Sequence, residues 1–127
     1  MTGVSGLDHV SILVNDTGRA LDFYHGILGL PVNAERPDLG FPGAWLDVGP
    51  GQQIHLLELP ADTCIDRPSV HGGRDRHIAL RVDDLDSVVG TLAEAGIDYT
   101  LSRSGRRALF CRDPDGNAVE LVESRSG

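Results

Sequence analysis

Apolar and polar residues follow the same order twice along the chain, which indicates an internal repeat. Residues 9–16 (HVSILVND) closely match residues 77–84 (HIALRVDD). In both segments apolar residues alternate with other residues, as in a strand that buries one face. Each segment is followed by an apolar stripe with the spacing of an amphipathic helix. The stripe consists of Ala20, Leu21, Tyr24, Ile27 and Leu28 in the first half, and of Leu85, Val88, Val89, Leu92 and Ala93 in the second.

Residues at the ends of these two stripes are typical of helix termini. Asp16 and Asp84 stand near the starts, where a carboxylate accepts free backbone N–H groups and is favoured by the helix dipole. Gly29 and Gly96 stand at the ends, where a left-handed backbone conformation is often required. We therefore expect one helix in each half of the chain.

Turn residues in the second part of each half predict a hairpin. The sequences Gly49-Pro50-Gly51 and 113–117 (DPDGN) separate apolar runs, as a tight turn between two strands would. The predicted strand pairs are 44–46 with 54–58 and 108–110 with 119–123, and a further short strand is expected near 31–34 and 98–102.

Each half therefore reads as a strand, a helix and about three more strands. This order predicts an α+β fold of two tandem βαβββ modules, at about residues 5–60 and 75–124, with mixed sheets that curve into a cup-shaped, barrel-like surface. The linker, roughly 60–75, is rich in Pro, Gly and charge. Because one module is too small to bury a full core alone, we expect the two to pair within residues 1–127 as a single domain, or across a dimer.

Composition and charge narrow the functional classes. The 127 residues are 40% hydrophobic and 24% charged, which is typical of a globular protein rather than a disordered one. No run approaches the ~20 apolar residues of a membrane span, and the first seven residues lack the features of a secretion signal. The net charge of −8 argues against nucleic-acid and anionic-membrane partners. We expect a cytoplasmic protein in which Cys64 and Cys111 are both reduced.

Four polar residues occupy two pairs of equivalent positions in the repeat. His9 corresponds to His77, and His55 corresponds to Glu120. Because side chains alternate along a strand, all four are predicted on the face opposite the apolar one. Three imidazoles and one carboxylate on a shared concave face could bind one divalent transition metal ion, with Zn, Ni, Co, Fe and Mn all compatible with these donors.

Purely structural roles remain open for these residues. A histidine on a strand is more often hydrogen-bonded than metal-bound, and duplication can preserve a structural histidine at two equivalent positions. His25 and His71 have no such partners and are expected in solvent, and Glu58 and Glu123 are expected to reach solvent at strand ends. Arg81 could meet an anionic substrate or be a solvated charge, and Trp45 and Phe41 could line a pocket or belong to the core.

Several short motifs, in this order and spacing, resemble the vicinal oxygen chelate superfamily, which includes glyoxalase I, bleomycin-resistance proteins and extradiol dioxygenases. The resemblance extends over about residues 7–123 and implies paired βαβββ modules, a cup-shaped metal site and often a homodimer. The motifs are Leu7-Asp8-His9-Val10, Phe23-Tyr24 with Leu28-Gly29-Leu30, residues 77–83 (HIALRVD) and residues 113–120 (DPDGNAVE).

The resemblance assigns metal-ligand positions to His9, His77 and Glu120. His55 departs from the pattern, because glyoxalase I carries Glu there and acyl-CoA epimerases of the superfamily carry Gln. Fosfomycin-modifying enzymes and extradiol dioxygenases use only two His and one Glu. His55 is therefore either a fourth ligand or a neighbour of the other three.

Three functions stay open on the sequence. The first is a metal-dependent lyase or isomerase similar to lactoylglutathione lyase, in which the metal polarises adjacent substrate oxygens and Glu120, or a group not yet assigned, moves a proton. The second is an Fe(II) dioxygenase of the extradiol type with His9, His77 and Glu120 as its ligands. The third is a protein that binds a drug or metabolite without turnover, although a complete ligand set argues against it. The substrate is expected to be a small molecule, and the metal site lies within one chain or between two.

Overall fold

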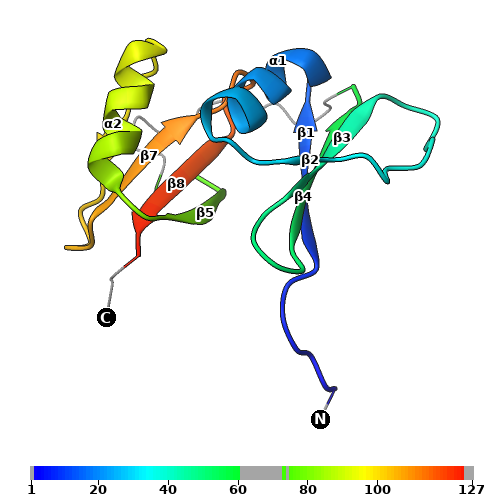
Figure 1. Ribbon diagram of the computed structural model, residues 1–127, viewed down its shortest axis with the longest axis horizontal. Coiled ribbons are helices and arrows are strands. Elements are labelled where there is room, and N and C mark those ends of the chain that lie inside the picture. The colour runs from blue at the N-terminus through cyan, green and yellow to red at the C-terminus, as the bar shows by residue number, and fades with distance from the viewer. Residues whose placement is uncertain (1, 61–72, 74, 125–127) are drawn as a thin grey trace. The chain divides into compact units, whose positions relative to one another are not determined.

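The computed structural model describes residues 2–60, 73 and 75–124, so Cys64, His71 and most of the predicted linker lie outside the described residues. The chain divides into two compact units, residues 1–63 and 64–127 (Figure 1). Every helix among the described residues is too short or too polar to cross a bilayer.

Each unit contains one helical segment and a four-stranded mixed sheet, which confirms the predicted α+β fold of two tandem modules. The sheets have strand orders β1-β4-β3-β2 and β5-β8-β7-β6, and neither closes on itself into a barrel. Unit 1 comprises β1 (His9–Val14), α1 (Thr17–Leu21), η1 (Asp22–Ile27), β2 (Val32–Asn33), β3 (Gly43–Asp47) and β4 (Gln53–Glu58). Unit 2 comprises β5 (His77–Val82), α2 (Leu85–Glu94), β6 (Thr100–Leu101), β7 (Ala108–Arg112) and β8 (Ala118–Glu123).

The first and last strands of each unit pair in parallel, β1 with β4 and β5 with β8. The other neighbours pair antiparallel, including the predicted hairpins β3–β4 and β7–β8. The second hairpin turn is organised by Asp113, which accepts hydrogen bonds from the backbone N–H groups of Asp115 and Asn117, both at 2.9 Å. The DPDGN motif is thus explained by turn geometry.

The helices bury most of the predicted side of the chain, with two differences. Ala93 of the predicted second stripe is exposed on α2. In unit 1 the α-helical turn of α1 continues as the π-helix η1, and Phe23 is buried next to Tyr24 instead of lying beside the stripe. Asp16 and Asp84 cap α1 and α2, and Gly29 and Gly96 adopt left-handed conformations, as predicted. The most deeply buried side chains are Val14, Ala20, Tyr24, Leu46 and Leu56 in unit 1, and Leu92, Leu109, Val119 and Leu121 in unit 2.

Glu58 and Glu123 are partly exposed, as expected, and in addition each binds a helix N-terminus. Glu58 Oε1 accepts the backbone N–H of Thr17 at 2.7 Å, and Glu123 Oε2 accepts that of Leu85 at 3.0 Å. The parallel strand pair brings each glutamate to the start of the helix because its strand ends beside the one that leads into that helix. In both units a carboxylate thus satisfies a free N–H at the positive end of a helix.

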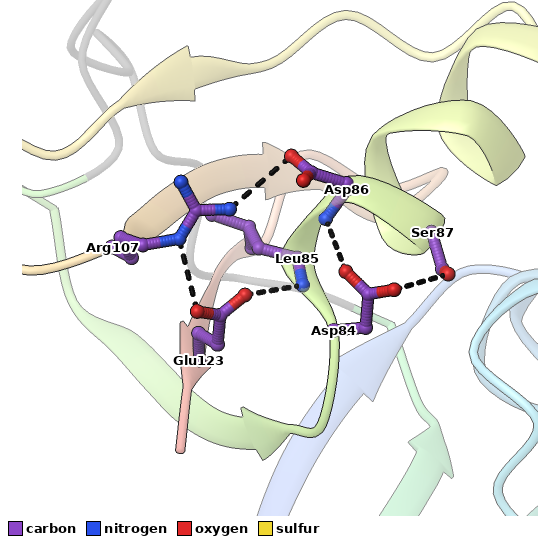
Figure 2. A network of polar contacts seen from close by, with 6 residues as sticks. All are labelled: Asp84, Leu85, Asp86, Ser87, Arg107 and Glu123. Atoms are coloured by element: carbon purple, nitrogen blue, oxygen red, sulfur yellow. Dashed lines mark hydrogen bonds and ion pairs between the residues drawn. The ribbon is translucent and has the colours of Figure 1, made fainter. Parts of the chain in front are cut away.

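Figure 2 shows the polar network around Glu123. The Arg107 Nε donates to Glu123 Oε1 at 2.9 Å, and its Nη2 contacts Asp86 Oδ1 at 3.2 Å. Asp84 accepts from the Asp86 N–H and the Ser87 hydroxyl at the same helix terminus. The Leu85 N–H and the Arg107 guanidinium together hold the pKa of the Glu123 carboxyl below its usual 4.5.

Replacing Glu123 with Gln is expected to lower the thermal unfolding midpoint at pH 7, because the charge at the α2 N-terminus is lost. A folded-state pKa below 4.5 means that this stabilisation is complete above pH 4.5 and disappears as the pH falls through the folded value. Unfolding of wild type and Glu123→Gln from pH 7 to pH 3 should therefore converge in acid. Glu35→Gln, at an exposed side chain, is the control, and a constant difference at every pH would contradict the assignment.

Cys111 lies on β7 with its side chain buried and free of disulfide bonding. Burial, and secondarily the nearby Asp113 charge, raise the pKa of the Cys111 thiol to about 11. Since the thiolate is the reactive form, about a thousandth of Cys111 is reactive at pH 8. We expect iodoacetamide to spare Cys111 in the native protein and to modify it in urea, as measured by peptide mass spectrometry. Equal labelling in both conditions would show that this part of the core opens.

Candidate functional site

His9 and His55 lie together on the face of the unit 1 sheet that is opposite its buried apolar residues, here called the outer face. In the parallel β1–β4 pair Ser11 stands opposite His55, so His9, two residues earlier, shares its face. The two imidazole rings stack with centroids 3.9 Å apart and planes inclined by 15°. Two of the four predicted site residues are therefore brought into contact.

Trp45 covers the other side of the His55 ring. It stands directly opposite His55 in the β3–β4 pair, and the two rings stack with centroids 4.3 Å apart and planes inclined by 6°. Trp45, His55 and His9 thus form a three-ring stack across β3, β4 and β1. Burial lowers the pKa of the His55 imidazole below its usual 6.5, and the adjacent His9 lowers this pKa further. His55 is consequently neutral at physiological pH.

Hydrogen bonds fix the edges of both rings. His9 Nδ1 lies 2.7 Å from Asp8 Oδ2, and His55 Nε2 lies 2.9 Å from Gln53 Oε1. Because the Asp8 carboxylate accepts, His9 Nδ1 carries the proton and His9 Nε2 carries the lone pair that can bind a metal.

His77 and Glu120 lie together on the outer face of the unit 2 sheet. Glu120 pairs with Ala79, two residues after His77, and the His77 Nε2 is 3.3 Å from Glu120 Oε1. The Glu120 side chain is only 5% exposed, whereas that of His77 is 26% exposed. Phe110, opposite Glu120 on β7, presents an edge-on ring contact to His77 with centroids 5.1 Å apart. The other two predicted site residues are thus also brought into contact.

Residues around this pair hold its orientation. His77 Nδ1 donates to the Asp75 carbonyl at 2.9 Å, and the Asp75 carboxylate is itself paired with Arg112 at 2.5 Å. On the far side of the carboxylate, Arg106 approaches Glu120 Oε2 at 3.5 Å. Neighbouring groups within unit 2 therefore orient both side chains of the pair.

The 3.3 Å contact between His77 and Glu120 is suited to a shared cation. Because Nδ1 donates to a carbonyl, Nε2 of a neutral His77 ring carries a lone pair, and this acceptor lies near a second acceptor on the carboxylate. A second proton on the ring or a metal ion converts the contact into an attraction. Two ligands of one transition metal, each at ~2.0–2.2 Å, lie roughly 3.0–3.5 Å apart at tetrahedral or octahedral angles. The observed separation lies in this range.

A hollow of about 380 Å³ opens at the β6–β7 edge of unit 2. Phe110, which contacts His77, is part of its lining, together with Tyr99 and Arg112. The buried hydroxyl of Thr100, which also lines the hollow, has no hydrogen-bond partner within the described residues. The lining of the hollow therefore combines aromatic residues with the charged side chains of Asp98 and Arg112, and it shares Phe110 with the surroundings of His77.

The four predicted metal ligands thus appear as two pairs, each within its own unit. Among residues 2–60, 73 and 75–124, no three His, Cys, Asp or Glu side chains gather at one point. A site that combines all four stays a prediction. Of the other residues weighed from the sequence, His25 is exposed as expected, with Nδ1 2.8 Å from the Leu30 carbonyl, and Arg81 is exposed.

Sequence reasoning missed the polar residues that surround the two pairs. Gln53 and Asp47 lie two positions from His55 and Trp45, on the same face of their strands, so the two-residue period could have found them. Arg106 precedes β7 in a loop, and nothing in its local sequence indicates that it contacts Glu120. Trp45, left open between pocket wall and core, is half-buried against His55.

Comparison with known proteins yields consistent relatives. The chain is 34% identical over 129 residues to Glyoxylase I 4 of Arabidopsis thaliana, covering 97% of this chain and 73% of that protein. It is 28% identical over 125 residues to lactoylglutathione lyase of Haemophilus influenzae, covering 93% and 92% of the two chains.

Solved structures share the fold. The lactoylglutathione lyase of Agrobacterium tumefaciens superposes with a TM-score of 0.67 at 23% identity, covering 97% of this chain and 96% of the other. An antibiotic binding protein from Streptomyces superposes with a TM-score of 0.73, also at 23% identity, covering 98% and 100%. A sequence model of the Glyoxalase/Bleomycin resistance protein/Dioxygenase superfamily matches residues 6–121. The chain belongs to this superfamily, as the motifs of its sequence indicate.

Proposed function

We propose that this protein is a divalent-metal-dependent lyase or isomerase that acts on a small molecule with two adjacent oxygens, as lactoylglutathione lyase does. The observation that carries the proposal is the His77–Glu120 pair, in which a nitrogen and a carboxylate oxygen lie 3.3 Å apart at the spacing of two metal ligands. The similarity to proteins named glyoxalase and lactoylglutathione lyase supports the reaction class.

His9, His77 and Glu120 would hold the metal, and His55, the fourth residue of the predicted set, lies against His9. Both His9 and His77 donate Nδ1–H to a neighbouring oxygen, so that Nε2 carries the lone pair in each. Two nitrogens and one oxygen suit Zn, Ni, Co, Fe or Mn. The pairs come from separate units, and we propose that they combine in a homodimer or within one chain.

When bound, the metal would act as a Lewis acid that polarises the adjacent oxygens of the substrate. Glu120 supplies the proton acceptor. Glu120 Oε1 faces His77 and Oε2 lies 3.5 Å from the Arg106 guanidinium, and in this proposal Oε2 takes a proton from one substrate carbon and returns it to the neighbouring carbon. Burial of the Glu120 side chain keeps water from competing for this proton.

The protein purified without an affinity tag is expected to bind about one equivalent of a divalent transition metal per site. The double variant His9→Ala/His77→Ala should lose that metal, because each substitution removes one nitrogen ligand. Elemental analysis after dialysis measures both. An exposed histidine, replaced in His25→Ala, is the control. If wild type stays metal-free after loading with each divalent ion, the metal proposal is wrong.

Glu120→Gln is expected to lower kcat for lactoylglutathione interconversion by about 10²–10⁴-fold, because the amide cannot accept the proton. The Glu35→Gln variant, at an exposed loop position, should keep wild-type activity. Undiminished turnover by Glu120→Gln would remove Glu120 from the mechanism.

The same assay separates the competing functions. Activity under strict anaerobiosis is expected from a lyase, and its loss without oxygen would indicate a dioxygenase. Ligand binding without turnover, unchanged by a chelator, would instead indicate a binding protein.

A further inference from the structure

We propose that His55 is a positioning residue for His9 and not a ligand of the metal. In this proposal a polar chain through Gln53 and Asp47 fixes the His55 ring, and the fixed ring orients His9 by stacking. The inference rests on the proposed metal function and assigns a role to the one position at which the sequence departs from its superfamily pattern. The residues that form this chain and this stack all lie in unit 1.

The direction of each hydrogen bond in the polar chain is set by Asp47. Its Oδ1 lies 3.0 Å from Asn33 Nδ2 and 3.1 Å from Gln53 Nε2. These two amides lower the pKa of the Asp47 carboxyl below its usual 3.8, so at neutral pH it is ionised and can only accept. The Gln53 amide must therefore turn its NH₂ group to Asp47 and its carbonyl oxygen away from Asp47.

That carbonyl oxygen faces His55. Gln53 Oε1 is 2.9 Å from His55 Nε2, and a carbonyl cannot donate, so Nε2 must carry the proton. In the neutral ring this leaves the lone pair on Nδ1. His55 is thus held in the opposite tautomer to His9 and His77, whose Nδ1 atoms donate to Asp8 and Asp75. The nitrogen that carries the lone pair in the other two histidines, Nε2, carries the proton in His55.

The ring geometry also argues against His9 and His55 binding the same ion. An imidazole binds a metal in the plane of its ring, along the nitrogen lone pair, at about 2.0–2.1 Å. The His9 and His55 rings are nearly parallel and stacked, at 15° and 3.9 Å. An ion in the plane of one ring therefore lies well outside the plane of the other. As they stand, the two rings cannot both bind one ion.

The stack instead gives His55 a mechanical role. His9 is the first residue of β1 and its side chain is 40% exposed, so little else restricts its ring. Trp45 supports His55 from behind, and Gln53 prevents it from rotating. The His9 ring packs one face on His55 and donates Nδ1–H to Asp8. These two contacts restrict rotation of the ring and so restrict the direction in which Nε2 points. Metal binding then has less side-chain entropy to overcome.

Two substitutions at position 55 separate a positioning role from a ligand role. His55→Phe keeps a flat ring between Trp45 and His9 without any nitrogen, and His55→Ala removes the ring. The test is a titration of Co(II) into each protein, followed by the visible absorption bands and the binding stoichiometry. We expect His55→Phe to bind one Co(II) with the wild-type spectrum and an affinity within about threefold. We expect His55→Ala to bind at least about tenfold more weakly.

A His55→Phe protein that loses cobalt as severely as His55→Ala, or whose bands shift to another coordination number, would overturn the proposal. Failure of wild type to bind any Co(II) would refute the metal function itself, which is a distinguishable result.

Nitrogen chemical shifts test the fixed tautomer without metal or activity. In ¹⁵N-labelled protein at neutral pH, long-range ¹H–¹⁵N spectra should show the Nε2–H form for His55 and the Nδ1–H form for His9 and His77. Gln53→Ala should remove the preference at His55 and leave His77 unchanged. The adjacent exposed Gln52→Ala is the matched control and should change neither. An Nδ1–H tautomer for His55 in wild type would contradict the proposal.

Discussion

The parallel pairing of the first strand with the last in each unit determines where the polar residues lie. Its register puts His55 beside Ser11 and Glu120 beside Ala79, and the two-residue period of a strand then places His9 and His77 on the same faces. Three residues further along, the same pairing carries Glu58 and Glu123 to the N-termini of the helices. The same strand pairing thus brings together the two residues of each outer-face pair and places a glutamate at the N-terminus of each helix.

The repeat conserves positions while the chemistry at those positions differs between the two units. In unit 1 the pair is two stacked imidazoles backed by Trp45, and its rings are fixed by carboxylates and an amide. In unit 2 the pair is an imidazole and a buried carboxylate, fixed by a carbonyl and by arginines. The unit 1 rings stack face to face, whereas in unit 2 a ring nitrogen lies 3.3 Å from a carboxylate oxygen. In this member of the superfamily, equivalent positions of the repeat therefore carry different chemistry in the two units.

Residues around the pairs orient the histidine rings. Asp8, Gln53 and the Asp75 carbonyl each select one tautomer of a histidine, and the tautomer decides which nitrogen can bind. Arg112 acts one step further out, since it holds Asp75 through its carboxylate. Such contacts involve long polar side chains whose conformations depend on their packing partners.

The sequence by itself determined the modules, the helix caps, the turns and the faces on which His9, His55, His77 and Glu120 lie. These features are periodic or local: alternation fixes a strand face, and Asp16, Gly29 and the DPDGN turn act within a few residues. The tertiary structure decided what each side chain touches. Glu58 and Glu123 share a strand face with core residues, and only the parallel pairing shows that each meets a helix terminus 41 or 38 residues away in sequence. The stacking of His55 between Trp45 and His9 likewise joins three strands, and no local pattern encodes the distances between them.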